Sequence, residues 1–285
     1  MAEFALPRPL RRPDRTADLR DPRAIHICTD RTLEGEAARS ATRAAIEERK
    51  DNLRIPPSKP PATGLMAKAA AAVPQPINYK MAVPVTKLWK PGSTLKVRLL
   101  GQPSAHVADR VRHYAGTWSE HANIRFRFVT KGAAQIRVAF DEDSGSWSYL
   151  GTDAKVVAAS KATMNYGWLD DETDDDEFSR VVLHEFGHAL GAIHEHNHPD
   201  SGIRWDRPAV YAYYRRTQGW TKAEVDAQIF RVYEDDQLNT GAYDRASIMH
   251  YAIPRELLLE GATPVPWNRK LSSRDKTFIR TQYPK

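Results

Sequence analysis

Hydrophobic and polar residues alternate along three short stretches in the middle of the chain, and this pattern predicts β-strands. The stretches are residues 94–100, 124–128 and 136–140, each bounded by turn residues. Between the first two, apolar residues recur at helical spacing over residues 106–118. The order strand, helix, strand, strand predicts a mixed α/β unit in this part of the chain.

The first 82 residues have a different texture, which predicts a low-complexity leader and linker in place of a packed core. They hold ten of the 19 prolines and an alanine-rich tract at residues 67–72. One helix is predicted within them, at residues 34–50, where alanines mark a weakly apolar face. We call residues 1–82 the leader and expect a separate folded unit at residues 83–285.

The run from His184 to His194 reads HEFGHALGAIH and has the spacing of a zinc site. His184 and His188 are four residues apart, so on a helix they project from one face and can bind one tetrahedral Zn²⁺. Gly191 lets the chain leave the helix through a positive φ, which brings His194 back as the third ligand. Three protein ligands leave the fourth position open, as is typical of catalytic zinc, and Glu185 is placed to act on a water there as general base. We therefore expect one Zn²⁺ per chain.

Two flanking patterns support a site helix and a catalytic metal. Residues 174–177 are acidic, which favours the start of the helix, and we prefer capping and solubility to a calcium site for them. Met249 lies downstream in a short apolar stretch, residues 247–251, where zinc peptidases with the extended histidine motif have their Met-turn. A further helix is predicted at residues 223–233.

With these motifs the chain resembles the metzincin metallopeptidases and, within them, the astacin family. The residue after the third histidine is Glu195, as in astacins, and residues 247–251 read SIMHY. Residues 146–151 read SWSYLG, which is similar to the family's substrate-side strand. The end of the chain, from residue 271 to residue 283, is similar to the family's closing helix.

The resemblance covers residues 83–285 and implies a two-subdomain zinc peptidase of mixed α+β and α/β class, preceded by the low-complexity leader. Residues 83–191 would hold the site helix and a twisted, mostly parallel sheet. Residues 146–151 would be its free antiparallel edge strand, to which an extended peptide can add itself. Residues 192–285 would form an irregular C-terminal half with the Met-turn.

The resemblance also implies roles for three further residues. Tyr251 would donate a hydrogen bond to the oxyanion and act as an extra metal ligand at rest, and Met249 would pack beneath the metal. Glu195 would meet the new N-terminus after removal of the leader. The implied activity is that of a zinc-dependent endopeptidase made as a zymogen, with protein or peptide substrates and with Glu185 as its base.

Cys28 is the single cysteine of the chain and lies in the leader. A thiolate is a good zinc ligand, so Cys28 is a candidate to occupy the open position and hold the enzyme latent. The alternative is an unpaired thiol without a role. His196 and His198 are surplus candidate ligands, which we interpret as surface or supporting residues because three histidines already complete the site.

Two other functions stay open on the sequence: a catalytically silent zinc-containing binding module, and a protein that cleaves only its own leader. The presence of Glu185 and Tyr251 favours an enzyme over the binding module. Activity on an added protein would separate a general protease from a self-processing protein.

Composition argues against other classes of protein. The net charge is +6, but lysine and arginine are spread among acidic residues without a basic helix or stripe, so we expect no nucleic-acid partner. No apolar run approaches the roughly 18 residues that span a bilayer, and residues 1–12 hold no signal-like apolar stretch, so we expect neither a membrane anchor nor classical export. The compartment stays open between cytoplasm and unconventional secretion, and a monomer is favoured.

Overall fold

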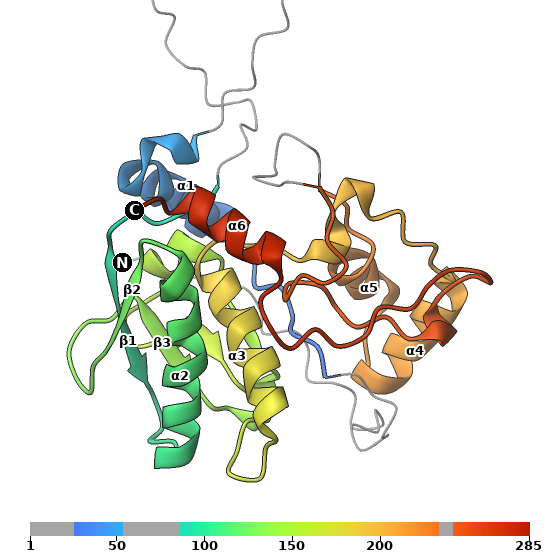
Figure 1. The fold of residues 1–285 in the computed structure, drawn as a ribbon, viewed down its shortest axis with the longest axis horizontal. Coiled ribbons are helices and arrows are strands. Elements are labelled where there is room, and N and C mark those ends of the chain that lie inside the picture. The colour runs from blue at the N-terminus through green and yellow to red at the C-terminus, as the bar shows by residue number, and fades with distance from the viewer. Residues whose placement is uncertain (1–25, 54–85, 234–241) are drawn as a thin grey trace, which may run out of the picture.

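The computed structural model describes residues 26–53, 86–233 and 242–285, and Figure 1 shows two halves with the sheet in one of them. The strands are β1 (Thr94–Leu99), β2 (Arg125–Phe128), β3 (Ile136–Ala139), β4 (Trp147–Ser148) and β5 (Met164–Asn165). The α-helices are α1 (Gly35–Glu48), α2 (Ala105–His121), α3 (Asp175–Ala189), α4 (Arg207–Gln218), α5 (Lys222–Gln228) and α6 (Ser273–Gln282). Within the described residues, none of the helices combines the length and the apolar character that crossing a membrane requires.

The five strands form one sheet in the order β2-β1-β3-β5-β4. β1 pairs in parallel with β2 and β3, and β3 pairs in parallel with β5. β4 is antiparallel to β5 and forms the edge. The predicted mostly parallel sheet with an antiparallel edge strand is therefore confirmed. β4 is shorter than the predicted 146–151, and β5 was not predicted, because a strand of two residues is too short to show an alternating pattern.

The alternating sequence of β1 matches its burial in the sheet. Leu95 and Val97 are buried in the core, and the residues between and beside them are less buried. Ser104 is the N-cap of α2, and its hydroxyl accepts the N–H of Val107 in the first turn. α2 and α3 lie side by side against the sheet (Figure 1) and share its core. The indole N–H of Trp118 on α2 donates to the carbonyl of Leu183 on α3, at 2.9 Å. This packing holds the site helix against the sheet.

α3 begins within the acidic run at residues 174–177, as predicted, but the predicted capping by an acidic side chain is not seen. Asp174 is the N-cap residue, yet its side chain makes no capping hydrogen bond. Asp175, Asp176 and Glu177 lie in the first turn, where negative charge suits the positive end of the helix dipole.

The C-terminal half has a core of its own, rich in aromatic residues. Asp206 is the N-cap of α4, and its carboxylate accepts the N–H of Ala209 at 3.1 Å. α5 begins with a capping box and ends at Gln228, before the predicted limit of residue 233. α6 returns to the first half, where the hydroxyl of Tyr283, just beyond the helix, donates to the carbonyl of Leu190 at 2.7 Å. The end of the chain is therefore fixed against the end of α3.

The leader passes between the two halves and changes one prediction (Figure 1, blue). Cys28 and Arg31 form parallel bridges to Ser146 and Tyr149, on either side of β4. The edge of the sheet is thus covered by the leader, whereas the sequence predicted a free edge. The helix predicted at 34–50 is confirmed as α1. The leader boundary at residue 82 and the alanine-rich tract lie outside the described residues.

Residues 86–90 enter the folded unit through a close approach to a glycine. The carbonyl of Lys87 accepts the N–H of Thr152 at 2.9 Å, and a Cβ on Gly151 would lie 1.8 Å from that carbonyl oxygen. Gly151 also has a φ of +46°, a conformation that residues with a side chain rarely adopt. Both the close contact and the positive φ therefore require glycine at this position. The Lys87 ammonium lies 2.9 Å from a carboxylate oxygen of Asp153, which fixes the segment further.

Candidate active site and metal centre

The end of α3 shapes the metal centre. Gly191 has a φ of +92°, and its N–H donates to the carbonyl of His188 at 2.8 Å. The N–H of Ala192 donates to the carbonyl of Gly187 at 3.0 Å, and these two bonds form the usual glycine-terminated helix end. The chain then turns back and brings His194 beside the helix, as the spacing predicted.

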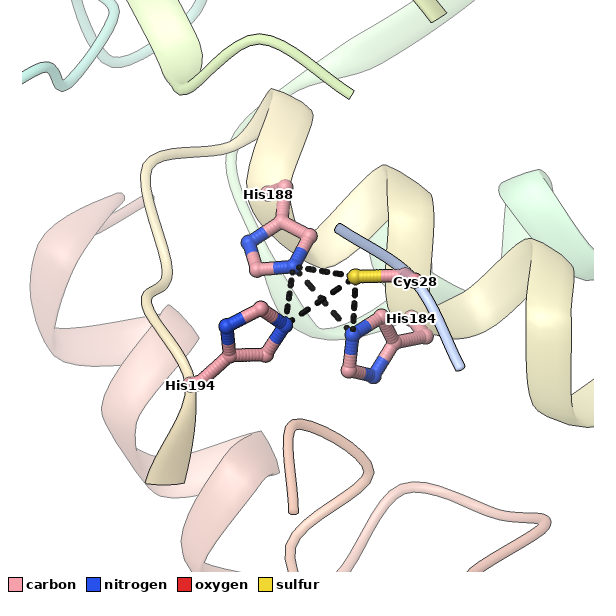
Figure 2. A group of neighbouring side chains, drawn as sticks. All are labelled: Cys28, His184, His188 and His194. Atoms are coloured by element: carbon pink, nitrogen blue, oxygen red, sulfur yellow. Dashed lines mark hydrogen bonds between the residues drawn. The ribbon is translucent and has the colours of Figure 1, made fainter. Parts of the chain in front are cut away.

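Four side chains converge from three parts of the chain, as Figure 2 shows. His184 and His188 come from α3, His194 from the segment after it, and Cys28 from the leader. The Cys28 Sγ lies 3.1, 3.4 and 3.0 Å from the Nε2 atoms of the three histidines in that order. The four ligand atoms all lie within 4.8 Å of one another, and all four residues are buried. The predicted three-histidine set is thus brought together, with the leader thiol at its fourth side.

The chemistry of these donors fits a zinc ion. The Nδ1 atoms of His184 and His188 each lie 2.8 Å from a backbone carbonyl oxygen and so carry the protons. Their Nε2 lone pairs then face each other at 3.2 Å, and His188 faces His194 at 3.1 Å, an arrangement that a cation makes favourable. Tetrahedral zinc separates two nitrogen ligands by about 3.3 Å, close to these two distances. It separates a nitrogen from a sulfur by about 3.6 Å, so the Cys28 sulfur lies closer to the histidines than in a zinc-bound site. Burial raises the pKa of the Cys28 thiol, and a zinc cation here would deprotonate it.

His194 has a partner that the sequence did not reveal. Its Nδ1 lies 3.0 Å from a carboxylate oxygen of Asp30, two residues beyond Cys28. Burial is the largest single influence on Asp30 and raises its pKa, but His194, together with His188 and His196, lowers the pKa of this carboxyl below its ordinary value. A carboxylate on the far nitrogen of a ligand histidine fixes the ring and its tautomer. The leader therefore supports the metal centre with a carboxylate as well as with a thiol.

Glu185 lies in a strongly desolvated position beside the three histidines. It is fully buried, and neither of its carboxylate oxygens has a hydrogen-bond partner among the described residues. Burial raises its pKa well above the ordinary value of a glutamate. An unpaired buried carboxylate is costly for folding, and a chemical role gives a reason for its place here.

Tyr251 faces the leader. Its hydroxyl donates to the carbonyl of Cys28 at 2.6 Å, and its side chain is buried. The ring of His196 stacks on it with a centroid distance of 4.2 Å, and His194 lies on it at 4.4 Å. The phenol is thus fixed next to the metal centre but is engaged by the leader main chain. Its predicted service as a ligand and as an oxyanion donor stays a prediction.

Met249 packs against α3 through a contact that explains a glycine of the motif, and its predicted place beneath the metal stays a prediction. A Cβ built on Gly187 would collide with the Met249 sulfur and would lie 3.2 Å from the Trp118 ring. Gly187, which the sequence did not single out, therefore leaves room for the Met-turn against α3. The Met-turn also supplies the carbonyl of Ile248, which binds Nδ1 of His184.

Glu195 lies at the wall of a cavity of 790 Å³ that Thr86 and Lys87 also line. One carboxylate oxygen accepts the N–H of Asp244 at 2.7 Å. Burial raises the pKa of Glu195 to about 7, although the Asp244 N–H opposes this. The residue predicted to meet a new N-terminus thus shares a cavity with residues that follow the leader.

His196 and His198 are both buried, so the surface interpretation is wrong for them, and a supporting role stays a prediction. His196 Nε2 lies 3.1 Å from the carbonyl oxygen of Gln228, and His198 Nδ1 accepts the N–H of Asp200 at 3.0 Å. Within the described residues, the group that can hold a metal includes neither histidine.

Comparisons with known proteins agree with this geometry. A model of the astacin family of peptidases matches residues 82–256. A structure of myroilysin is 48% identical, covers 70% of this chain and 96% of its own, and has a TM-score of 0.68. A crystal structure of myroilysin, also 48% identical, covers 70% and 86% with a TM-score of 0.56. High choriolytic enzyme 1, a hatching-enzyme zinc protease from the medaka Oryzias latipes, is 21% identical, covers 69% and 94%, and has a TM-score of 0.47. The comparison with curated proteins found no match.

The site combines a histidine pair on a helix, a third histidine beyond a glycine turn and a Met-turn packed against the same helix. Together these features define a zinc metallopeptidase of the metzincin class. The matched family model spans more than half of the chain and most of the sheet half and Met-turn. The chain belongs to the astacin family.

Proposed function

We propose that the protein is a zinc endopeptidase that hydrolyses peptide bonds of proteins, and that the leader holds it latent. The observation that carries the proposal is the convergence of three histidine Nε2 atoms beside a buried, unpaired glutamate. A peptide segment already lies across this centre and pairs with the sheet edge, as a substrate would have to do.

The residues of the site divide the chemistry among them. Bound zinc supplies a Lewis acid at the scissile carbonyl and lowers the pKa of water. Glu185 takes a proton from the attacking water and returns it to the leaving amine. Once Tyr251 is released from the Cys28 carbonyl, its phenolic hydroxyl donates a hydrogen bond to the developing oxyanion. Burial lowers the pKa of His184 and of His188 and so favours their neutral, metal-binding state.

Latency follows from the position of Cys28. Its sulfur occupies the side of the histidine set where water has to act, and its carbonyl engages Tyr251. Removal of the leader would free both groups at once. A new N-terminus near residue 83 would lie just ahead of Thr86 and Lys87, which share the cavity of Glu195. We propose that Glu195 receives this N-terminus in the mature enzyme.

The test of activity compares the zinc-loaded full-length protein with Glu185→Gln on casein, while the protein's own N-terminus is sequenced over time. The proposal expects the wild type to clear casein after losing a segment that ends near residue 82, and Glu185→Gln to do neither while keeping its zinc. Glu142→Gln, at an exposed acid, is the matched control and should behave as wild type.

The outcomes separate the alternatives. If wild type removes its leader but leaves casein intact, the protein is self-processing only. If wild type and Glu185→Gln both cleave while zinc is bound, Glu185 is not the base. If neither cleaves casein or the leader while zinc is bound, the binding module becomes the better account. Cys28→Ala should give activity without removal of the leader, whereas Thr32→Ala, at an exposed leader position, should not. Unchanged latency in Cys28→Ala would refute the role of the thiol.

A further inference from the structure

The leader shows how an extended main chain lies in the cleft between the two halves. On the sheet side, the N–H of Thr29 donates to the carbonyl of Ser146 at 3.1 Å, next to β4. On the opposite side the next residue, Asp30, is held by the C-terminal half through Gln228. Two rims of the cleft thus bind consecutive residues of one peptide.

Gln228 binds Asp30 through the main chain alone. Its Oε1 accepts the Asp30 N–H at 2.8 Å, and its Nε2 lies 3.4 Å from the Asp30 carbonyl oxygen. Gln228 is 6% exposed, so these partly buried bonds are shielded from much of the surrounding water. Because the N–H and C=O of one residue in an extended chain point to the same side, a carboxamide can bind both, whatever the side chain is.

Gln228 is held at a fixed position relative to the metal centre. Its own carbonyl oxygen lies 3.1 Å from His196 Nε2, two residues from His194. The segment after α5 is tied to the same stretch, since the Asn197 amide donates to the carbonyl of Arg231 at 2.7 Å and the Asn197 carbonyl accepts the N–H of Tyr233 at 3.1 Å. The carboxamide is therefore preorganised beside the third ligand.

We propose that Gln228 is a substrate-binding residue that clamps the main chain of a peptide substrate from the rim opposite β4. This inference rests on the proposed peptidase function and assigns the second rim of its cleft. The clamped residue would lie two positions from the residue at the metal, as Asp30 lies two positions from Cys28.

The clamp does not depend on the direction of the bound chain. The leader runs parallel to β4, and a substrate running the opposite way would present its N–H and C=O in exchanged places. Rotation of the terminal amide by half a turn exchanges Oε1 and Nε2 and restores both bonds. One side chain can thus serve the leader first and substrates later, and it imposes no side-chain preference at that position.

The test uses the zinc-loaded enzyme in its active form and a set of peptides with one cleavage site. Each peptide carries one amide-to-ester replacement, which removes a single backbone N–H. The replaced N–H lies at one of the three positions on either side of the scissile bond and is never that of the scissile bond itself. For the wild type, we expect one position to lose roughly 5- to 10-fold in kcat/KM because the Gln228 bond is lost. In Gln228→Ala, the parent peptide should be slower by a similar factor, and the ester at that position should cost nothing further.

Gln228→Glu is the matched variant, because it keeps an acceptor but loses the donor. It should retain the ester penalty that Gln228→Ala abolishes, and it gives the answer if Gln228→Ala does not fold. Equal ester penalties in wild type and Gln228→Ala at every position would overturn the clamp and leave the peptidase intact. Failure of the wild type to cleave any parent peptide would instead refute the proposed function itself.

Discussion

Tyr251 is bonded to the leader main chain, so its role can be tested only after the leader has gone. We expect Tyr251→Phe to lower kcat of the active enzyme by a factor on the order of 10² to 10³, because the oxyanion loses a donor. The aromatic ring that stacks on His196 is preserved, so zinc content and KM should change little. Steady-state kinetics with metal analysis check this, and an unchanged kcat would exclude the phenol from the reaction.

Residues close together in the sequence were predictable, and distant partners were not. The spacing of His184, His188 and His194 predicted the centre because helical periodicity and one glycine turn decide their geometry locally. Gln228 reaches Asp30 across 198 positions, which no local pattern reports. Cys28 was predicted from its chemistry, since a lone thiol in a leader has few other uses.

The leader is held at the metal centre through Cys28 and Asp30, and a second time through α1 and the 3₁₀ turn Lys50–Asn52 that follows α1. Asn52 is fully buried, and its amide donates to the carbonyls of Ala45 and Leu88 at 2.7 and 2.8 Å. Its Oδ1 accepts the Leu88 N–H at 3.1 Å and the Thr86 hydroxyl at 2.8 Å. Every polar atom of this side chain is satisfied, and three of its four bonds go to the segment that follows the leader.

Asn52→Ala should therefore weaken latency. It leaves the N–H and C=O of Leu88 without partners while the leader is bound, which costs about 1–3 kcal/mol per group. We expect the initial rate of the intact full-length protein on casein to rise roughly 10- to 100-fold, as the leader dissociates more often. Asp51→Ala, an exposed neighbour, is the control and should leave the rate unchanged. Equal rates for both variants would show that α1 and its turn do not contribute to latency.

Elements with several turns or alternations were predicted, and the shortest ones were not. The alternation in β1, β2 and β3 and the apolar face of α2 were visible because each spans at least two periods of its pattern. α4 was missed although its buried positions, residues 210, 213, 214 and 217, recur at helical spacing. The expectation of an irregular C-terminal half masked this pattern. That the leader covers the sheet edge required knowledge of the tertiary structure.

At the scale of the molecule, the metal centre ties together the leader, α3 and the Met-turn. His184 binds the carbonyl of Ile248, and His194 lies against Asp30 of the leader. Zinc bound to such a site stabilises the folded state alone and so raises the midpoint of unfolding. Much of the cohesion between the two halves should therefore depend on the ion.

Chelation of the full-length protein should lower its Tm by about 10 °C, a shift that a few kcal/mol of binding free energy produces in a protein of this size. Added zinc should restore the Tm, and calcium should not. His194→Ala should show little response to the chelator, whereas His113→Ala, at an exposed histidine, should respond as wild type. The same Tm with and without chelator in wild type would mean that the site does not hold zinc.

The most direct test of a latent zinc peptidase is zinc K-edge X-ray absorption of the full-length protein before and after removal of the leader, with casein cleavage measured on the same samples. The account predicts one sulfur and three nitrogen ligands before removal, and loss of the sulfur together with the appearance of activity. A zinc shell without sulfur in the inactive full-length protein, or activity while the sulfur stays bound, would contradict it.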